Sequence, residues 1–150
     1  MSVRLDQLLN LPELKNLKLV SGIKGLDKRV KWVHVIESPD DVLDHVQKNE
    51  LIIVTGVRIL NNKDDFIELI KKLIVTKAAG LVVNVGKYID KVPLEAKSIS
   101  DENDFPVFEF PWELSLAGLT KTICADILKR NLEEVYCQDQ IGRASCRERV

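Results

Sequence analysis

Residues Val30–Gly56 read VKWVHVIESPDDVLDHVQKNELIIVTG, and this stretch decides the fold. Its two apolar, β-branched runs, Val30–Ile36 and Leu51–Thr55, are typical of strands buried on both faces of a parallel sheet. Between them, SPDD at residues 38–41 combines a helix cap, a proline suited to a first turn and acidic residues that favour a helix N-terminus. The stretch therefore predicts a βαβ crossover, which is right-handed by default.

The same alternation continues along the chain. Phe66, Leu69, Ile70 and Leu73 recur at helical spacing and predict an amphipathic helix over Asp64–Thr76. The remaining predicted helices are Val3–Leu9, Val92–Ser100 and Leu114–Val135, and the remaining predicted strands are Leu17–Val20, Leu81–Val85 and Phe105–Phe110. This order favours an α/β layered domain with a mostly parallel sheet of about four to five strands flanked by helices.

Two details of the strand pairing stay open in the sequence. Leu17–Val20 and Val30–Ile36 are joined by a turn-rich connection of intermediate length, which does not decide whether they pair as an antiparallel hairpin. Pro106 places Phe105–Phe110 either at a sheet edge or with its proline at the strand's beginning, because proline donates no ladder hydrogen bond.

Composition indicates one soluble globular domain. The chain has 150 residues, of which 45% are hydrophobic and 30% charged. Its formal net charge of -1 offers no electrostatic footprint for nucleic acid. We expect a cytoplasmic protein with no membrane partner, since no apolar run approaches the roughly 20 residues that span a bilayer and the N-terminus lacks a signal-peptide core.

The cysteines predict neither a disulfide framework nor a zinc site. There are three of them, an odd number, and none shows the spacing of a zinc ligand pair. Cys124 falls on the apolar side of a helix and is expected to be a small buried hydrophobe. Residues 141–150, IGRASCRERV, lack apolar periodicity and resemble read-through of a cloning vector, so neither this tail nor its Cys146 contributes to the predicted fold.

A ligand site is predicted where the strands end. In open parallel sheets, ligands bind outside the carboxyl ends of the strands. The residues at or just after the predicted strand ends are Glu37, Thr55, Gly56, Asn84, Gly86 and Trp112. They offer a carboxylate, a hydroxyl, an amide, close approach to the backbone and a stacking face. The alternative is that the two glycines are turn residues and that Glu37 caps the following helix.

Catalytic chemistry has little support. His34 lies inside an apolar strand, where a satisfied core or interface histidine is expected, and His45 is expected on the surface. Asp40, Asp41 and Asp44 lack the histidine or glutamate spacing of a metal site. The chain has no GxGxxG, Walker A or GxSxG motif. We predict no catalytic residue, no metal and no cofactor.

Several motifs in order resemble one family. The Val30–Gly56 stretch is followed by AAGLVV at Ala78–Val83, VP at residues 92–93 and FPVFEFPWE at Phe105–Glu113, and it is preceded by a G-x-x-G-L-D turn at Gly22–Asp27. Together they resemble the N-terminal domain of PucR-like (purine catabolism regulator-like) transcriptional regulators, over residues 1–128. Residues 129–140 would then begin a linker helix and 141–150 would be the read-through tail.

The resemblance implies a non-enzymatic sensory domain of a regulator of purine or nitrogen catabolism. A small-molecule effector would bind at the strand ends and bias how the Leu114–Val135 helix leaves the domain. DNA would be contacted only by domains outside this chain, and a homo-oligomer is expected because regulators of this kind act on DNA as oligomers. Two alternatives stay open: a small α/β enzyme or enzyme subunit with Glu37 and His34 as acid and base, and a ligand-free dimerisation scaffold.

Overall fold

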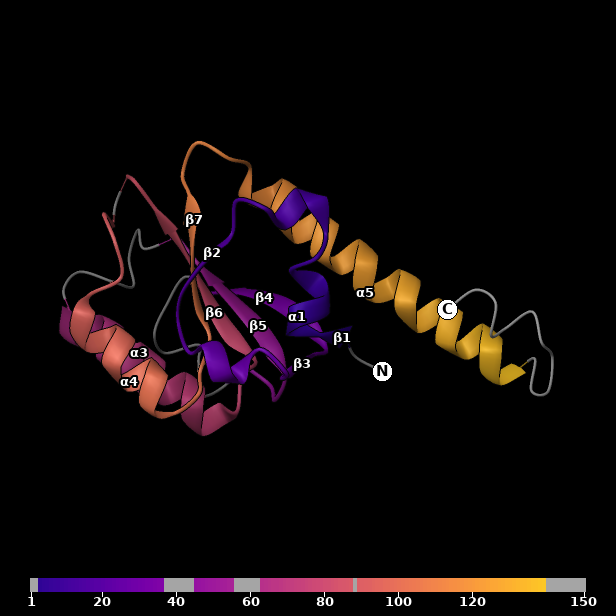
Figure 1. Cartoon of the computed structure of the whole chain (residues 1–150), viewed down its shortest axis with the longest axis horizontal. Helices are drawn as coiled ribbons and strands as arrows, with labels where there is room; N and C mark the ends of the chain where they lie inside the picture. The colour runs from indigo at the N-terminus through magenta and orange to yellow at the C-terminus, as the bar shows by residue number, and fades with distance from the viewer. Residues whose placement is uncertain (1–2, 37–44, 56–62, 88, 140–150) are drawn as a thin grey trace.

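A five-stranded mixed sheet forms the centre of the molecule. The structure is a computed structural model that describes residues 3–36, 45–55, 63–87 and 89–139. The strands are β2 (Lys18–Ser21), β4 (Trp32–Ile36), β5 (Glu50–Val54), β6 (Gly80–Val85) and β7 (Val107–Pro111). Their order across the sheet is β2-β7-β6-β5-β4, with β4 to β7 parallel and β2 antiparallel to β7 (Figure 1). The predicted α/β domain with a mostly parallel sheet is confirmed.

Helices cover both faces of the sheet. On one face, α3 (Lys63–Thr76) and α4 (Leu94–Glu102) pack on the buried side chains of Ile52, Val54, Leu81 and Val83. The opposite face is covered by α5 (Leu116–Asp139) together with the N-terminal α1 (Leu5–Leu8) and the 3-10 turn η1 (Pro12–Leu14) (Figure 1). Strands buried on both sides explain why their sequences are continuously apolar rather than alternating.

The predicted strand Val30–Ile36 is divided between two sheets, which corrects the sequence-based prediction. Its first residue belongs to β3 (Arg29–Val30), which pairs antiparallel with β1 (Val3–Arg4) in a separate two-stranded sheet. The break falls at Lys31, whose backbone N–H donates to the Asn49 carbonyl at 2.7 Å. The predicted helix Val3–Leu9 is likewise part strand and part α1, because Val3 pairs with Val30.

The open pairing of β2 is resolved by a distant partner. β2 and β4 lie at opposite edges of the sheet, so the two do not form a hairpin, and β2 pairs with β7 instead. β7 is an inner strand and Pro106 comes just before it, where its carbonyl accepts the Leu81 N–H at 3.0 Å. The predicted crossover helix between β4 and β5 falls mostly on residues 37–44, outside the described residues.

The last helix begins beside the sheet and extends away from it. Leu119, Ile123 and Ile127 of α5 are buried against the sheet, whereas Leu128 and Leu132 are 51% and 69% exposed. Its 24 residues make α5 about 36 Å long, and Figure 1 shows it running past the body of the domain. In the described part of the chain, no helix is both long enough and apolar enough to cross a membrane.

Candidate functional site

Three neighbouring parallel strands bring four of the predicted site residues together at the carboxyl-terminal ends of the strands. Thr55 follows β5, Asn84 lies near the end of β6, Gly86 follows β6 and Trp112 follows β7. The register aligns Val54 with Val83, so Thr55 takes the position beside Asn84, about 5 Å away between adjacent strands. We call the surface formed by these four residues the strand-end rim. Glu37 and Gly56 lie outside the described residues, so their part in it stays a prediction.

Asn84 is the unusual member of the rim. Its side chain is 3% exposed, and its Oδ1 atom accepts no hydrogen bond from any residue that the structure describes. An unpaired buried carbonyl oxygen costs about 1–3 kcal/mol. Leu81 and Val83 point to the sheet face that α3 and α4 cover, so the side chain of Asn84, the next residue along β6, points to the opposite face. Its register partner Phe110 lies on that same face, which α5 covers. The rim therefore holds a buried hydrogen-bond acceptor that no described residue satisfies.

The loop that follows β7 is bonded to the end of β6, and the loop that follows β6 is closed by a hydrogen bond of its own. The Trp112 N–H donates to the Val85 carbonyl at 2.8 Å, and the Gly86 N–H donates to the Ile89 carbonyl at 2.7 Å. Gly86 has φ of 110°, a conformation that favours glycine, which supports the turn role weighed for it in the sequence. The Lys87 ammonium lies 5.0 Å from the centre of the Trp112 ring, so a cation already occupies a face of this indole.

His34 lies away from the rim. Its side chain is 28% exposed on β4, and its Nδ1 atom lies 3.3 Å from Oε1 of Glu50. Glu50 begins β5, at the opposite end of the strand from the rim, and its carboxylate also accepts the Gln47 N–H at 2.6 Å. The His34–Glu50 contact joins the edge strand β4 to the inner strand β5, and it does not direct the His34 side chain toward the strand-end rim.

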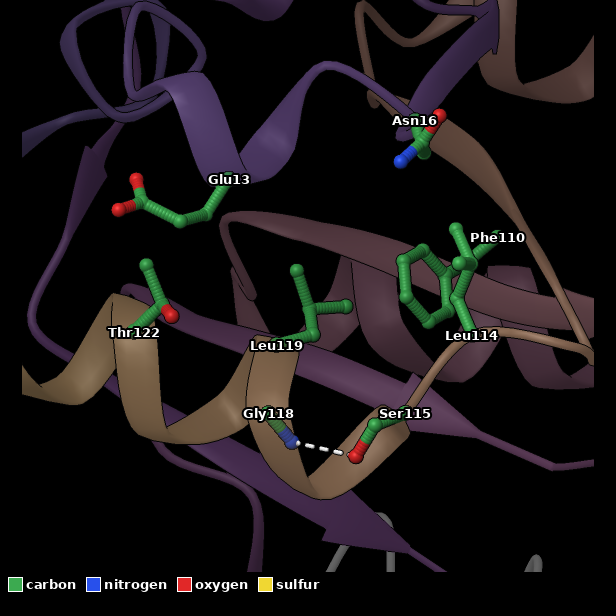
Figure 2. Close-up of a pocket in the computed structure, with 8 residues that line it drawn as sticks. All are labelled: Glu13, Asn16, Phe110, Leu114, Ser115, Gly118, Leu119 and Thr122. Atoms are coloured by element: carbon green, nitrogen blue, oxygen red, sulfur yellow. Dashed lines mark hydrogen bonds between the residues drawn. The ribbon is translucent and has the colours of Figure 1, made fainter.

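A pocket that sequence reasoning missed lies between η1 and the first turns of α5 (Figure 2). Its volume is about 250 Å³. Its apolar walls are Phe110, Leu114 and Leu119, and its polar side chains are Glu13, Asn16, Ser115 and Thr122. The Gly118 N–H donates to Ser115 Oγ at 2.9 Å, so Ser115 caps α5 at the pocket. We call this the η1–α5 pocket.

A second hollow continues from the η1–α5 pocket along the helix. It has a volume of about 490 Å³ and shares Glu13, Gly118 and Thr122 with the first. Its further lining residues include Lys121 and Lys129 as well as Asp126. Asp126 is engaged by Arg130 at 2.8 Å, one helical turn away. The charge of this second hollow is therefore mixed, whereas the first has one carboxylate and no basic residue among its lining residues.

Comparison with known proteins points to one family of regulators. The model of the purine catabolism regulatory protein-like family, PucR, matches residues 7–127. The purine catabolism regulatory protein of Bacillus subtilis (strain 168) is 26% identical to this chain over 127 residues. The match covers 85% of this chain and 24% of that protein. The chain thus spans about a quarter of the length of the curated relative that it matches.

Proposed function

Since this chain belongs to the purine catabolism regulatory protein-like family, we propose that it is the metabolite-sensing domain of a transcriptional regulator of purine or related nitrogen catabolism. The Bacillus relative is named a purine catabolism regulatory protein. In this proposal the domain binds a small polar effector, and it controls a DNA-binding domain outside these 150 residues. The formal net charge of -1 supports the proposal that another domain binds the DNA, because DNA affinity requires clustered cations.

The observation that carries the ligand site is the buried, unpaired Oδ1 of Asn84 at the strand-end rim. Such a group is costly unless something donates to it. Thr55 lies beside it on the neighbouring strand and adds a hydroxyl. An effector with N–H or O–H donors satisfies both groups, and the predicted Glu37 and Gly56 would complete the contact surface.

The output of the domain is proposed to pass through α5. This helix begins at Leu116, shortly after the rim residue Trp112, and Ser115 caps it. Its buried half is anchored by Leu119, Ile123 and Ile127, and the rest extends beyond the body. An effector shifts the helix only to the extent that it binds one packing of α5 better than another, and a tenfold preference corresponds to about 1.4 kcal/mol.

Residues beyond about 128 are proposed to serve as the linker and as a contact between copies. Leu128 and Leu132 lie one turn apart on α5 and are both exposed. A second copy of the same helix would cover them in a homo-oligomer. The enzyme alternative loses support because His34 contacts Glu50, which lies at the other end of β5 from the rim.

A thermal-unfolding screen tests the sensing proposal against the scaffold alternative. Purines and their breakdown products are added to the 150-residue chain, and an effector present at one hundred times its Kd is expected to stabilise the fold by about 2.7 kcal/mol. Substitution of Asn84 by leucine is expected to abolish that stabilisation. If no compound raises the midpoint temperature of the unsubstituted chain, the ligand-free scaffold is the better account.

A further inference from the structure

We propose that β4 is a dimerisation strand. Two copies of this chain would pair antiparallel through the edges of their β4 strands, about a two-fold axis at His34, and so join two five-stranded sheets into one continuous sheet. The proposal adds a strand-to-strand contact to the α5 contact between copies proposed above. It rests on that proposed self-association, and it does not require an effector at the strand-end rim.

The two edge strands of the sheet differ in how well they are protected against pairing. β2 (KLVS) has four residues, an exposed Lys18 and a bulge between Leu19 and Ser21. Short length, lysine and bulges are means by which natural sheets protect an edge. β4 (WVHVI) has five residues in unbroken register with β5, and it contains no lysine, carboxylate, proline or glycine. Its Trp32 and Val35 are 39% and 41% exposed. The edge at β4 is therefore suited to pairing.

The backbone of β4 directs hydrogen-bonding groups to this edge. The Leu81 N–H donates to the residue before β7, so Leu81 faces β7 and the preceding Gly80 faces β5. In a parallel pair, only one residue of each register pair bonds to the other strand. Gly80 faces β5, so its register partner Leu51 faces β4. Val33 is the register partner of Leu51 and therefore faces away from β5, as does Val35. Among the described strands, β5 is the only partner of β4.

An axis at His34 gives the register that pairs all five residues of β4. It sets Val33 against Val35 of the second copy, and these residues exchange the outward N–H and C=O groups as a hydrogen-bonded pair. It also sets Trp32 against Ile36 of the second copy. Val33 and Ile36 are 7% and 2% exposed, so each pair places an exposed apolar side chain beside a buried one. The pattern of exposure along β4 is therefore self-complementary, as a two-fold interface requires.

The charges near β4 are compatible with this register. His34 lies opposite His34 of the second copy, and Glu50 Oε1, 3.3 Å from the imidazole Nδ1, offsets the charge of a protonated ring. Lys31 precedes the strand, so the axis at His34 places the two Lys31 residues at opposite ends of the paired strands. Like charges directly opposite each other would destabilise the pair, and this register avoids them.

α5 lies beside the same edge and enlarges the contact. The Val33 backbone bonds to the Cys124 thiol, a weak acceptor that a carbonyl of the second copy can replace. Figure 1 shows α5 passing β4 as it leaves the body of the domain. Leu128 and Leu132 follow Cys124 at steps of four residues, so the three share one line of the helix. A stable interface buries roughly 800 Å² per partner, and these exposed leucines add to the area of the strand edge.

The test is sedimentation equilibrium of the 150-residue chain and of two variants. Val35→Lys puts an ammonium into the apolar edge and is expected to raise the Kd of the dimer about tenfold or more. The matched control, Val75→Lys, makes the same change at a 73% exposed position on α3 and is expected to leave the Kd unchanged. The proposal is overturned if the unsubstituted chain is monomeric at all concentrations, or if both variants dimerise alike.

Amide hydrogen exchange of the unsubstituted chain makes the test independent of how well the Val35→Lys variant folds. The Val35 N–H is bonded only in the dimer, so its exchange is expected to slow about tenfold or more between dilute and concentrated solution. The amides of β2, at the other edge, are expected to exchange equally in both. A dimer in which the Val35 amide stays unprotected overturns the pairing of β4 and leaves α5 as the contact. Effector-induced thermal stabilisation is measured separately, so a failure of sensing and a failure of pairing are distinguishable.

Discussion

Asn84 and Phe110 occupy paired register positions on the parallel strands β6 and β7, on the sheet face beneath α5. Both side chains are buried, yet one is an aromatic wall of the η1–α5 pocket and the other an amide with an unpaired oxygen. An apolar residue at position 84 would continue the apolar character of this face. The polar residue is therefore a cost to the fold that a ligand at the rim would offset.

Substitution of Asn84 by leucine is expected to stabilise the unliganded chain and to remove its response to effector. The two side chains have similar shapes, and leucine leaves no buried polar group unpaired, so we expect a gain of about 1 kcal/mol in the free energy of unfolding. Asn84→Asp is the opposing control, because a buried carboxylate without a cation is expected to cost about 3 kcal/mol. Urea unfolding measures both. A loss of stability in the leucine variant would show that the amide is structural.

The strands can be predicted from sequence because burial on both faces gives short, continuous apolar runs that are rich in β-branched residues and bounded by turn residues. The predicted Leu51–Thr55 and Leu81–Val85 agree within a residue with the observed β5 and β6. The break at Lys31 escapes prediction, because the run Val30–Ile36 is largely apolar and the division depends on the pairing of Val30 with Val3. Partners far apart in sequence leave no mark in a local pattern.

For the same reason, the strand-end rim could be predicted from the sequence and the η1–α5 pocket could not. Parallel strands end at one edge, so a rule that needs only strand order brings Thr55, Asn84 and Trp112 together. Glu13 lies in a proline-initiated turn that Asn16 follows, and the sequence there predicts only the end of a helix. The packing of Leu14, 2% exposed, fixes that turn against the domain. Apolar spacing in this segment indicates burial but not the α5 partner.

Among the glycines that the structure describes, Gly22 is expected to be the least tolerant of alanine. It has φ of 75°, and a Cβ atom there would collide with the backbone carbonyl of Phe105. Its N–H also donates to Asp101 Oδ1 at 2.6 Å, so the backbone cannot easily move away. We expect Gly22→Ala to cost about 2–4 kcal/mol.

The matched control for Gly22 is Gly118→Ala. A Cβ atom there would come 3.3 Å from the Ser115 hydroxyl oxygen, which sits on a short rotatable side chain. Because alanine favours helix over glycine by about 1 kcal/mol, we expect a change of less than about 1 kcal/mol in either direction. Thermal unfolding compares the two variants. Equal losses at both positions would contradict the claim that the left-handed turn at Gly22 is the constraint.

Lys28 is expected to make stability depend on pH in the alkaline range. Burial beside Phe105, whose ring centre lies 5.4 Å from the ammonium, lowers the pKa of Lys28 below its ordinary 10.5, although Asp104 and Asp27 oppose the shift. The unfolded chain then binds more protons between the two pKa values, so this residue's contribution to stability rises with pH through that window. Below the folded-state pKa, the cost of the buried charge is fully present.

The variant Lys28→Met isolates that contribution from the other titrating groups. It is expected to be more stable than the unsubstituted chain near neutral pH, and its advantage is expected to shrink as the pH approaches 10.5. Urea unfolding of both chains at several pH values from neutral up to 10.5 gives the difference directly. An advantage that stays constant over this range would contradict a lowered pKa.

The two halves of α5 are expected to respond differently to substitution. Ile123 is fully buried against the sheet, so Ile123→Ala is expected to cost about 2–5 kcal/mol at any protein concentration. Leu132 is 69% exposed, so Leu132→Asp is expected to change the stability of a single chain by less than about 0.5 kcal/mol. If Leu128 and Leu132 join two copies, the aspartate instead weakens self-association, because it brings like charges together in an apolar contact. Sedimentation equilibrium of both variants separates the two effects, and an unsubstituted chain that stays monomeric at all concentrations would remove this role for the exposed half of α5.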